Sequence, residues 1–177
     1  MSYSSHSSFN RFAEATLADL WLPEESCEQV LDWMTGNKNF LVYLGNPGIG
    51  KTHLSRAVLK DYTKGINHKR YWKEADLLAR LRSGMDDRGD YIENLKYLCD
   101  DDLIIIDDLG SCGLTDWRKE VLFALIDFRY ESMKPTMFTS NLSRNDFKEN
   151  FEPRVFSRLF DKENTILEIS GKDRRLN

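Results

Sequence analysis

The sequence predicts an α/β protein in which a five-stranded parallel sheet carries helices on both faces. Short apolar runs alternate along the 177 residues with longer segments whose apolar side chains recur every three or four positions. This alternation is typical of strands joined by crossover helices. The first apolar run also leads straight into a glycine-rich loop and then into a helical segment. The length suits a single domain.

Each expected strand is one of the short apolar runs. The run FLVYL at 40–44 is continuous and is followed at once by Gly45, which is typical of a strand buried on both faces. The run at 103–106 is rich in β-branched residues and is bounded by acids, which favours a strand. The five expected strands are residues 40–44, 69–72, 103–106, 136–140 and 165–169.

The segments between these runs predict helices. The helix after the first strand begins at about Gly50, and the longest helix is marked by apolar positions from Trp117 to Phe128 and ended by Lys134-Pro135. The remaining expectations are helices at 74–83 and 154–160, a loop at 84–90, and one or two amphipathic turns at 91–98.

Composition and charge restrict the classes of function. With 25 Lys and Arg against 29 Asp and Glu, the formal net charge is −4, which argues against a protein that coats nucleic acid with a basic surface. The apolar runs are too short to cross a bilayer, and the serine-rich start lacks the pattern of a secretory signal. Three cysteines without a CxxC pair indicate a reduced protein. We therefore expect a cytoplasmic protein with no membrane partner.

The residues Gly45–Thr52 (GNPGIGKT) match the phosphate-loop pattern GxxxxGK[ST] between an expected strand and an expected helix. In such a loop, backbone N–H groups and the positive end of the next helix bind phosphates. Lys51 would contact the β- and γ-phosphates, and the Thr52 hydroxyl would bind Mg²⁺. A glycine-rich turn with a surface lysine is the alternative, but it should rarely produce the full pattern. The candidate nucleotide-binding residues are Gly45, Asn46, Pro47, Gly48, Ile49, Gly50, Lys51, Thr52 and His53.

Two other expected strands end in polar residues at the same edge of the sheet. Asp107 and Asp108 follow the strand at 103–106, where ligands of open α/β sheets collect. We expect Asp107 to bind Mg²⁺, and Asp108 to orient or deprotonate a water that attacks the γ-phosphate. Asn141 follows the next strand and would hold that water through its amide. The alternatives are acids that only cap a strand and a polar turn at Asn141.

Two arginine pairs are further candidates. Arg154 and Arg158 lie one helical turn apart and would share a face of their helix. Most pairs of this kind are solvated or paired with acids, so their spacing alone assigns no catalytic role. The same applies to Arg174 and Arg175 in the basic end of the chain.

Several segments, taken in their order along the chain, resemble the AAA+ ATPases, and within them the DnaC-like helicase loaders of bacteria and phages. The resemblance spans roughly residues 10–177, and only the phosphate loop is decisive alone. The matching segments are Arg11-Phe12 through Leu20, GNPGIGKTHL (Gly45–Leu54), LIIIDDLG (Leu103–Gly110), Asp127–Tyr130 with KPTMFTSNL (Lys134–Leu142), and PRVFSRL (Pro153–Leu159).

The resemblance implies a role for each matching position. Gly45–Thr52 corresponds to the Walker A motif, Asp107-Asp108 to the Walker B motif, and Asn141 to the sensor I residue. Arg158 matches the arginine finger that reaches a neighbouring subunit's γ-phosphate, with Arg154 as the alternative.

The resemblance also implies what the protein does. It suggests a slow ATPase that uses ATP and Mg²⁺ and is stimulated by DNA or a partner. Family members form ring or spiral oligomers, bind single-stranded DNA in the central channel and deliver the replicative helicase onto DNA. We therefore expect ATP-dependent self-association, a helicase partner and single-stranded DNA in the assembled state. Arg175, or alternatively Arg174, falls where such loaders carry a sensor II arginine.

The sequence departs from the family pattern at three places. Asp108 stands where many AAA+ proteins have Glu, and the shorter side chain should slow hydrolysis. Only Ser170–Asn177 follow the expected fifth strand, so we expect no helical lid, which loaders also largely lack. About ten residues precede the core, where loaders usually carry a helicase-binding domain. The expected organisation is a flexible tail at residues 1–9 and one ATPase domain at residues 10–177.

The segment 74–99 sits where such loaders have a helical element facing the channel. A solvated helix with aromatic residues in the core is the more probable arrangement for any one of its side chains. The candidates for contact with phosphates or bases are Arg80, Arg82, Arg88, Tyr71 and Trp72.

Three other functions stay open. An IstB-like ATP-dependent helper of a transposase shares nearly all these motifs. The protein could also be a regulatory protein that holds ATP with little turnover, since Asp108 should slow hydrolysis. A small phosphotransferase has a similar length and phosphate loop, but Asp107-Asp108 and Asn141 fit that class poorly.

Overall fold

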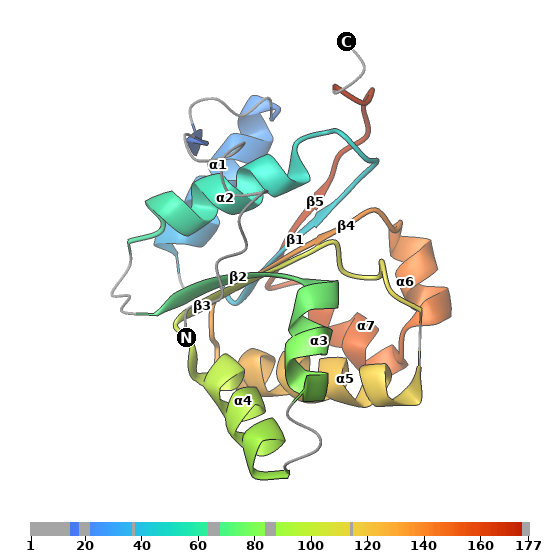
Figure 1. The fold of residues 1–177 in the computed structure, drawn as a ribbon. Coiled ribbons are helices and arrows are strands. Elements are labelled where there is room, and N and C mark those ends of the chain that lie inside the picture. The colour runs from blue at the N-terminus through green and yellow to red at the C-terminus, as the bar shows by residue number, and fades with distance from the viewer. Residues whose placement is uncertain are drawn as a thin grey trace.

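Five parallel strands form one sheet in the order β2–β3–β4–β1–β5 (Figure 1). The protein's structure is a computed structural model that describes residues 15–17, 22–36, 38–63, 68–83, 88–113 and 115–174. The sheet confirms the parallel α/β fold and all five strands that the sequence predicts, to within one residue at each end. The strands are β1 (Phe40–Leu44), β2 (Lys69–Lys73), β3 (Leu103–Asp107), β4 (Thr136–Ser140) and β5 (Thr165–Glu168).

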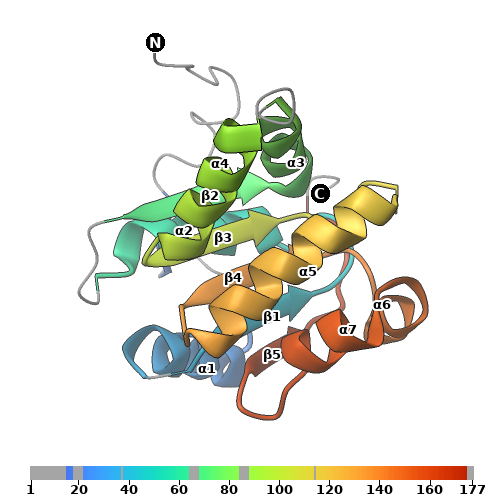
Figure 2. The same ribbon diagram turned by 90° about the horizontal axis from the view of Figure 1, so that it is seen from below.

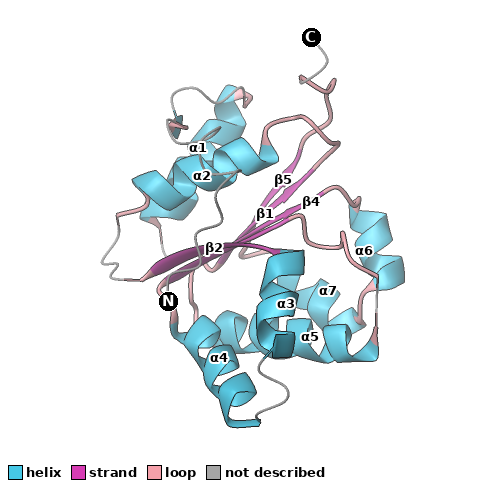
Figure 3. Cartoon of the chain, viewed as in Figure 1, coloured by secondary structure: helices cyan, strands magenta, loops and turns pink. Residues whose placement is uncertain are grey.

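The described ranges contain seven helices, and all of them except α6 cover a face of the sheet (Figures 2 and 3). The helices α1 and α2 lie on one face, and α3, α4, α5 and α7 lie on the other. Within the described residues, no helix is long and apolar enough to span a membrane. The bounds are α1 (Glu24–Thr35), α2 (Lys51–Asp61), α3 (Glu74–Ser83), α4 (Arg88–Asp100), α5 (Asp116–Glu131), α6 (Arg144–Asn150) and α7 (Pro153–Leu159).

Side chains along each strand alternate between two hydrophobic clusters, one on each face of the sheet. On β1, Phe40, Val42 and Leu44 pack in the cluster beside α5, whereas Leu41 and Tyr43 pack in the cluster beside α2. Every residue of β1, β3 and β4 is buried. Burial on both faces explains why these strands are continuous apolar runs in the sequence.

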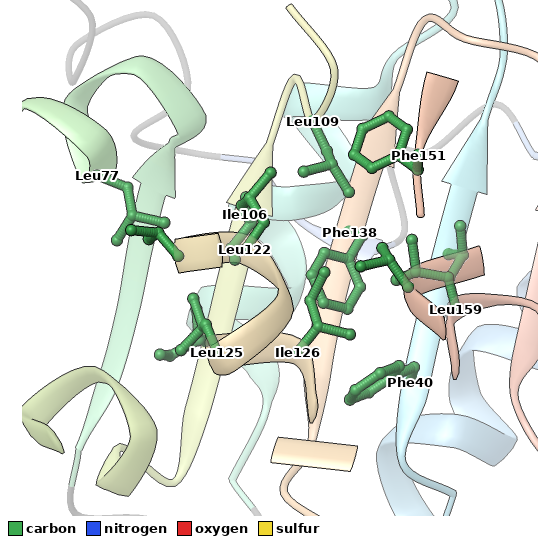
Figure 4. Packing of buried hydrophobic residues seen from close by; sticks show 14 of the residues in the cluster. Phe40, Leu77, Ile106, Leu109, Leu122, Leu125, Ile126, Phe138, Phe151 and Leu159 are labelled. Atoms are coloured by element: carbon green, nitrogen blue, oxygen red, sulfur yellow. The ribbon is translucent and has the colours of Figure 1, made fainter. Parts of the chain in front are cut away.

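The hydrophobic cluster beside α5 packs that helix against the sheet. Figure 4 shows Leu122, Leu125 and Ile126 of α5 pointing toward Ile106 of β3 and Phe138 of β4. All five side chains are at most 1% exposed. A Leu→Ala change at such a position costs about 2–5 kcal/mol.

A buried arginine joins the end of α4 to the sheet. Arg129 of α5 is fully buried and donates hydrogen bonds to the carbonyl oxygens of Leu98, Cys99 and Asp101 at 3.1, 3.0 and 2.8 Å. These acceptors include carbonyls that the last turn of a helix leaves without an intrahelical partner. Burial lowers the pKa of Arg129 to about 10, so the side chain is still a cation at neutral pH.

Two helices were not expected from the sequence. In α1, Val30, Trp33 and Met34 are buried against the α2 side of the sheet, and their i, i+3, i+4 spacing is the signal that identifies this helix. In α6, Ser143 is the N-cap and forms a capping box with Asp146. The usual capping-box pattern has Glu or Gln at that position, so the Asp in the sequence is a weaker signal.

The loop expected at 84–90 is wrong at its end, because α4 begins at Arg88 and includes Gly89 and Asp90. Glycine and aspartate together are typical of loops, but here they occupy the first turn of a helix of 13 residues. Residues 84–87 lie outside the described residues, as do the tail expected at 1–9 and the matching segment at 11–20 except for residues 15–17.

Candidate nucleotide-binding site

The loop between β1 and α2 lies at the edge of the sheet where the strands end at their carboxyl side. Its first residue is anchored to the neighbouring strand, since the Gly45 N–H donates to the Ser140 carbonyl at 3.1 Å. The loop ends at Gly50, which is the N-cap of α2 and has φ of +101°. Glycine adopts this left-handed conformation without the steric cost that other residues incur. The loop therefore directs the N-terminal end of α2 toward the edge of the sheet, where an anion would bind.

The Lys51 side chain connects the loop to the end of β4. Lys51 is 6% exposed, and its Nζ donates hydrogen bonds to the carbonyl oxygens of Gly45 and Asn46 at 2.6 and 2.9 Å. Its third bond goes to Asn141 Oδ1 at 2.6 Å. The structure thus brings the predicted phosphate-binding lysine and the predicted water-holding amide into direct contact.

The Asp107 carboxylate at the end of β3 accepts hydrogen bonds from four hydroxyl groups. Oδ2 accepts from Thr52 Oγ1 at 2.8 Å and from Tyr71 OH at 2.6 Å. Oδ1 accepts from Ser55 Oγ at 3.4 Å and from Thr139 Oγ1. Asp107 is fully buried, and these donors satisfy its oxygens in place of water. The two predicted Mg²⁺ ligands, Thr52 and Asp107, therefore lie side by side.

The residue after Asp107 has an unusual backbone conformation. Asp108 has φ of +59°, a left-handed value that is uncommon outside glycine but tolerated by Asp and Asn. The turn is held from β4, since the Asp108 N–H donates to Thr139 Oγ1 at 3.1 Å and the Leu109 N–H donates to the Thr139 carbonyl at 2.8 Å. The Thr139 hydroxyl thus contacts both residues of the acidic pair. Backbone strain of this kind is frequent at functional sites.

A buried ion pair supports the same turn from the other side. Glu74, at the start of α3, is fully buried and accepts hydrogen bonds from the Gly110 N–H at 2.9 Å and from Arg118 Nε at 2.8 Å. Arg118 Nη2 lies 2.6 Å from the same carboxylate, and Nη1 donates to the Cys112 carbonyl. No local pattern predicts this pair, because its members are 44 residues apart.

The predicted arginine finger lies elsewhere in the chain. Arg158 of α7 forms an ion pair with Asp127 of α5, and Arg154 is exposed. The guanidinium groups of Arg154 and Arg158 lie 5.7 and 5.6 Å from the ring centroid of Phe123. The helix α7 packs on the face of the sheet opposite α2, and the contacts of both arginines within the described residues are with α5 and with α7 itself, away from the phosphate loop.

The segment after β5 packs on the phosphate loop. The Arg174 N–H donates to the Gly48 carbonyl at 3.2 Å, and the Asp173 carboxylate is so close that a Cβ on Gly48 would lie 1.8 Å from its Oδ1. The other sensor II candidate, Arg175, lies outside the described residues. His53, the last candidate from the sequence, is in the first turn of α2 and is half-buried.

The donors at this site suit Mg²⁺ better than they suit a metal ion whose ligands all come from the protein. The described residues contain no group of three or more His, Cys, Asp or Glu side chains able to hold a metal ion. Mg²⁺ is usually bound by one or two protein oxygens together with waters and substrate phosphates. The Thr52 hydroxyl and the Asp107 carboxylate supply that type of donor.

Both aromatic candidates for contact with DNA bases make contacts within the chain. The Tyr71 hydroxyl is bonded to Asp107, and Trp72 packs against the cluster beside α5. Both residues are half-buried, and stacking of bases on their rings stays a prediction. Arg80 bonds to Asn94 Oδ1 at 3.3 Å, and Arg82 lies 5.3 Å from the ring centroid of Trp117. The Arg88 side chain lies outside the described residues.

This fold and this loop together define a P-loop ATP-binding protein of the AAA+ class. The sequence model of the family described as "IstB-like ATP binding protein" matches residues 25–176, and the chain belongs to that family. The crystal structure of the DnaC helicase loader is similar, with a TM-score of 0.76 and 29% identity over 90% of this chain and 98% of that chain. The family and fold predicted from the sequence are confirmed.

Two curated relatives come from different biological settings. A protein of insertion sequence IS232 from Bacillus thuringiensis subsp. berliner, described as ATP-binding, is 28% identical over 87% of this chain and 64% of its own length. The replicative helicase loader DnaC of Escherichia coli strain K12 is 24% identical over 74% of this chain and 54% of its own length. The chain therefore spans less than two thirds of either relative.

Proposed function

We propose that this protein binds and hydrolyses ATP with Mg²⁺, assembles into oligomers when ATP is bound, and loads a replicative helicase onto single-stranded DNA. The observation that carries the ATPase part is the convergence of Lys51, Asn141, Asp107 and Thr52 at one edge of the sheet. The similarity to the DnaC helicase loader supports the loading part. We further propose that residues 10–177 form one ATPase domain.

Each group at the edge of the sheet has a distinct task in this proposal. The N–H groups of Gly45–Thr52 bind the phosphates, and Lys51 leaves its three acceptors to contact the β- and γ-phosphates. Thr52 and Asp107 hold Mg²⁺, which when bound neutralises charge that develops on the phosphates. His53, in the first turn of α2, is also proposed to contact the nucleotide.

The second half of the reaction concerns the attacking water. Asp108, which follows β3 in a left-handed backbone conformation, orients this water and accepts its proton. Asn141, released by Lys51, holds the same water through its amide. Asp has one methylene fewer than Glu, so we expect slow turnover that assembly on DNA or on a partner accelerates.

Completion of the site requires a second copy of the chain. We propose that Arg158 is the arginine finger and that it contacts the γ-phosphate of the neighbouring subunit. Its position on the face opposite α2 supports contact between chains rather than within one. Arg174, bonded to the loop through its backbone, or Arg175 would contact the nucleotide of its own chain.

Mixed oligomers test this arrangement. Chains carrying Lys51→Ala and chains carrying Arg158→Ala should each lack ATPase activity, and mixing them should restore part of it, because some interfaces then combine an intact loop with an intact arginine. Arg154→Ala is the matched control and should hydrolyse ATP alone. Absence of recovery at every mixing ratio, with both chains folded, would contradict shared sites.

A transposition helper is the second candidate function. The family match and the similarity to a protein of an insertion sequence support it as strongly as the DnaC similarity supports loading. Affinity capture from the native host, with ATP and with a slowly hydrolysed analogue, separates the two. Recovery of a hexameric helicase supports the loader, and recovery of a transposase supports the helper.

A regulatory ATP-binding protein is distinguished by turnover. A loader should hydrolyse ATP faster when single-stranded DNA or its partner is added. Bound ATP that is not hydrolysed under any of these conditions would point to the regulatory alternative.

A further inference from the structure

Tyr71 donates to the Asp107 carboxylate from β2, a strand that carries none of the recognised motifs. It lies on β2, the edge strand, where it pairs with Ile105 of β3. Asp107 is two positions beyond Ile105, and alternate residues of a strand share a face. The Tyr71 side chain therefore reaches diagonally along the sheet, and its hydroxyl donates to Asp107 Oδ2 at 2.6 Å.

The Tyr71 ring is held in place from the other side. Arg56 of α2 stacks on it, with the guanidinium carbon 3.4 Å from the ring centroid. A cation over an aromatic face is stabilising, most strongly where water is partly excluded. Burial, together with the nearby Asp107 charge, raises the pKa of the Tyr71 phenol well above its usual range.

Tyr71 and Thr52 donate to the same oxygen of Asp107. The terminal torsion of an Asp side chain is broad, so the number of donors on each oxygen decides how firmly the carboxylate is oriented. Oδ2 is the oxygen that faces Thr52, the other group proposed to hold Mg²⁺. A donor from β2 keeps Oδ2 in this orientation when Thr52 exchanges its hydrogen bond for a cation.

We propose that Tyr71 is a positioning residue that fixes Asp107 Oδ2 beside Thr52 and thereby sets the Mg²⁺ affinity of the nucleotide site. The inference rests on the proposed binding of ATP with Mg²⁺. Tyr71 acts through Asp107 and touches neither the nucleotide nor the reacting atoms.

The test is the Mg²⁺ dependence of nucleotide binding rather than activity. Binding of mant-ATP is measured by fluorescence for the wild type, Tyr71→Phe and Tyr43→Phe, first in EDTA and then along a Mg²⁺ titration. We expect Tyr71→Phe to raise the half-saturating Mg²⁺ concentration about three- to tenfold, less than direct loss of a hydrogen bond to a charged ligand. Its affinity in EDTA should equal that of the wild type.

Tyr43→Phe is the matched control, because it removes a buried phenol from the same face of the sheet. The Tyr43 hydroxyl has no hydrogen-bond partner among the described residues, so its removal should leave the Mg²⁺ titration unchanged. A purely structural role of Tyr71 would lower the unfolding midpoint and leave the half-saturating Mg²⁺ concentration at the wild-type value. That result would overturn the proposal.

A double-mutant cycle with Asp107→Asn keeps the proposal testable if Tyr71→Phe is destabilised. In the Asp107→Asn background, Tyr71→Phe should have no further effect on the Mg²⁺ titration, since the group it positions is gone. Additive effects would show that Tyr71 acts elsewhere. If the wild type binds no mant-ATP at any Mg²⁺ concentration, the proposed function itself fails, which is a distinct outcome.

Discussion

Lys51 Nζ donates a hydrogen bond to Asn141 Oδ1 at 2.6 Å, so the phosphate loop and the end of β4 are linked across 90 residues of the chain. This bond means that the nucleotide-free protein already pairs its lysine cation with a neutral acceptor. A phosphate group is the stronger partner for that cation. Nucleotide binding should therefore release the Asn141 amide at the moment when it is needed beside the γ-phosphate.

The first prediction concerns this bond. In the nucleotide-free protein, Asn141→Ala should lower the free energy of unfolding by about 1–2 kcal/mol, because a nearly buried cation loses one of its three acceptors. ATP hydrolysis should fall about tenfold or more, with mant-ATP affinity near that of the wild type. Urea unfolding and steady-state ATPase measurements check both parts. Asn145→Ala, an exposed position on α6, should change neither; equal effects of the two variants would contradict the assignment.

The second prediction concerns the segment after β5. Gly48→Ala should destabilise the protein by about 1–2 kcal/mol or more, since Gly48 has φ of +79° and the added Cβ would lie 1.8 Å from Asp173 Oδ1. Adding Asp173→Ala should recover only the part of this loss that comes from the carboxylate, because the Asp173 Cα would still lie 2.8 Å from the added Cβ and φ stays left-handed. Urea midpoints measure both.

Gly113→Ala is the control for that series, because nothing lies within 4 Å of the position of its Cβ. If the double variant is no more stable than Gly48→Ala alone, the Asp173 side chain does not pack on the loop in solution.

The third prediction concerns the buried ion pair. Glu74→Ala should destabilise the protein by about 3–5 kcal/mol, because it leaves the Arg118 cation buried without its partner. Replacing both residues by apolar ones, as in Glu74→Leu with Arg118→Met, should cost much less, since no uncompensated charge is left. Thermal unfolding gives the comparison. Asp76→Ala, exposed on the same helix, should be nearly neutral, and a loss there as large as at Glu74 would refute the explanation.

The fourth prediction concerns the partner of Arg158 within the chain. Asp127→Asn removes a partly exposed ion pair and should cost at most about 1 kcal/mol of stability. Because the arginine is then free to contact a neighbouring subunit, ATPase activity of the assembled protein should equal or exceed that of the wild type. Arg158→Ala should abolish it. Asp116→Asn, at an exposed position of α5, controls for charge; loss of activity in Asp127→Asn would assign the catalytic requirement to the acid instead.

The sequence predicts those parts of the protein whose structure depends on residues close together along the chain. The phosphate loop is contiguous, and the strand run Leu103–Asp107 is apolar because both faces of the sheet are covered, so each could be recognised locally. Arg118 lies 44 residues from Glu74, and Tyr71 lies 36 residues from Asp107. Such pairs form only when β2 and β3 are neighbours, and strand order is not encoded in any local pattern.

Local sequence patterns fail to predict the start of α4 for a different reason. Gly89 has a low helical propensity, yet it lies in α4, whose buried Leu98 and Cys99 pack against the rest of the core. Tertiary packing of this kind overrides local propensity. The capping box of Ser143 and Asp146 is the local signal for α6, but it is weak because Asp replaces the usual Glu or Gln.

The strand order has a consequence for synthesis of the protein. β1, which carries the phosphate loop, lies between β4 and β5, with Phe40 opposite Thr136 and Leu41 opposite Thr165. Both neighbours belong to the last third of the chain, so β1 stays unpaired while the ribosome makes most of the protein. Such late pairing of distant strands is slow and leaves apolar segments exposed to aggregation. The phosphate loop and Asn141 therefore come together only after β4 has been synthesised and has paired with β1.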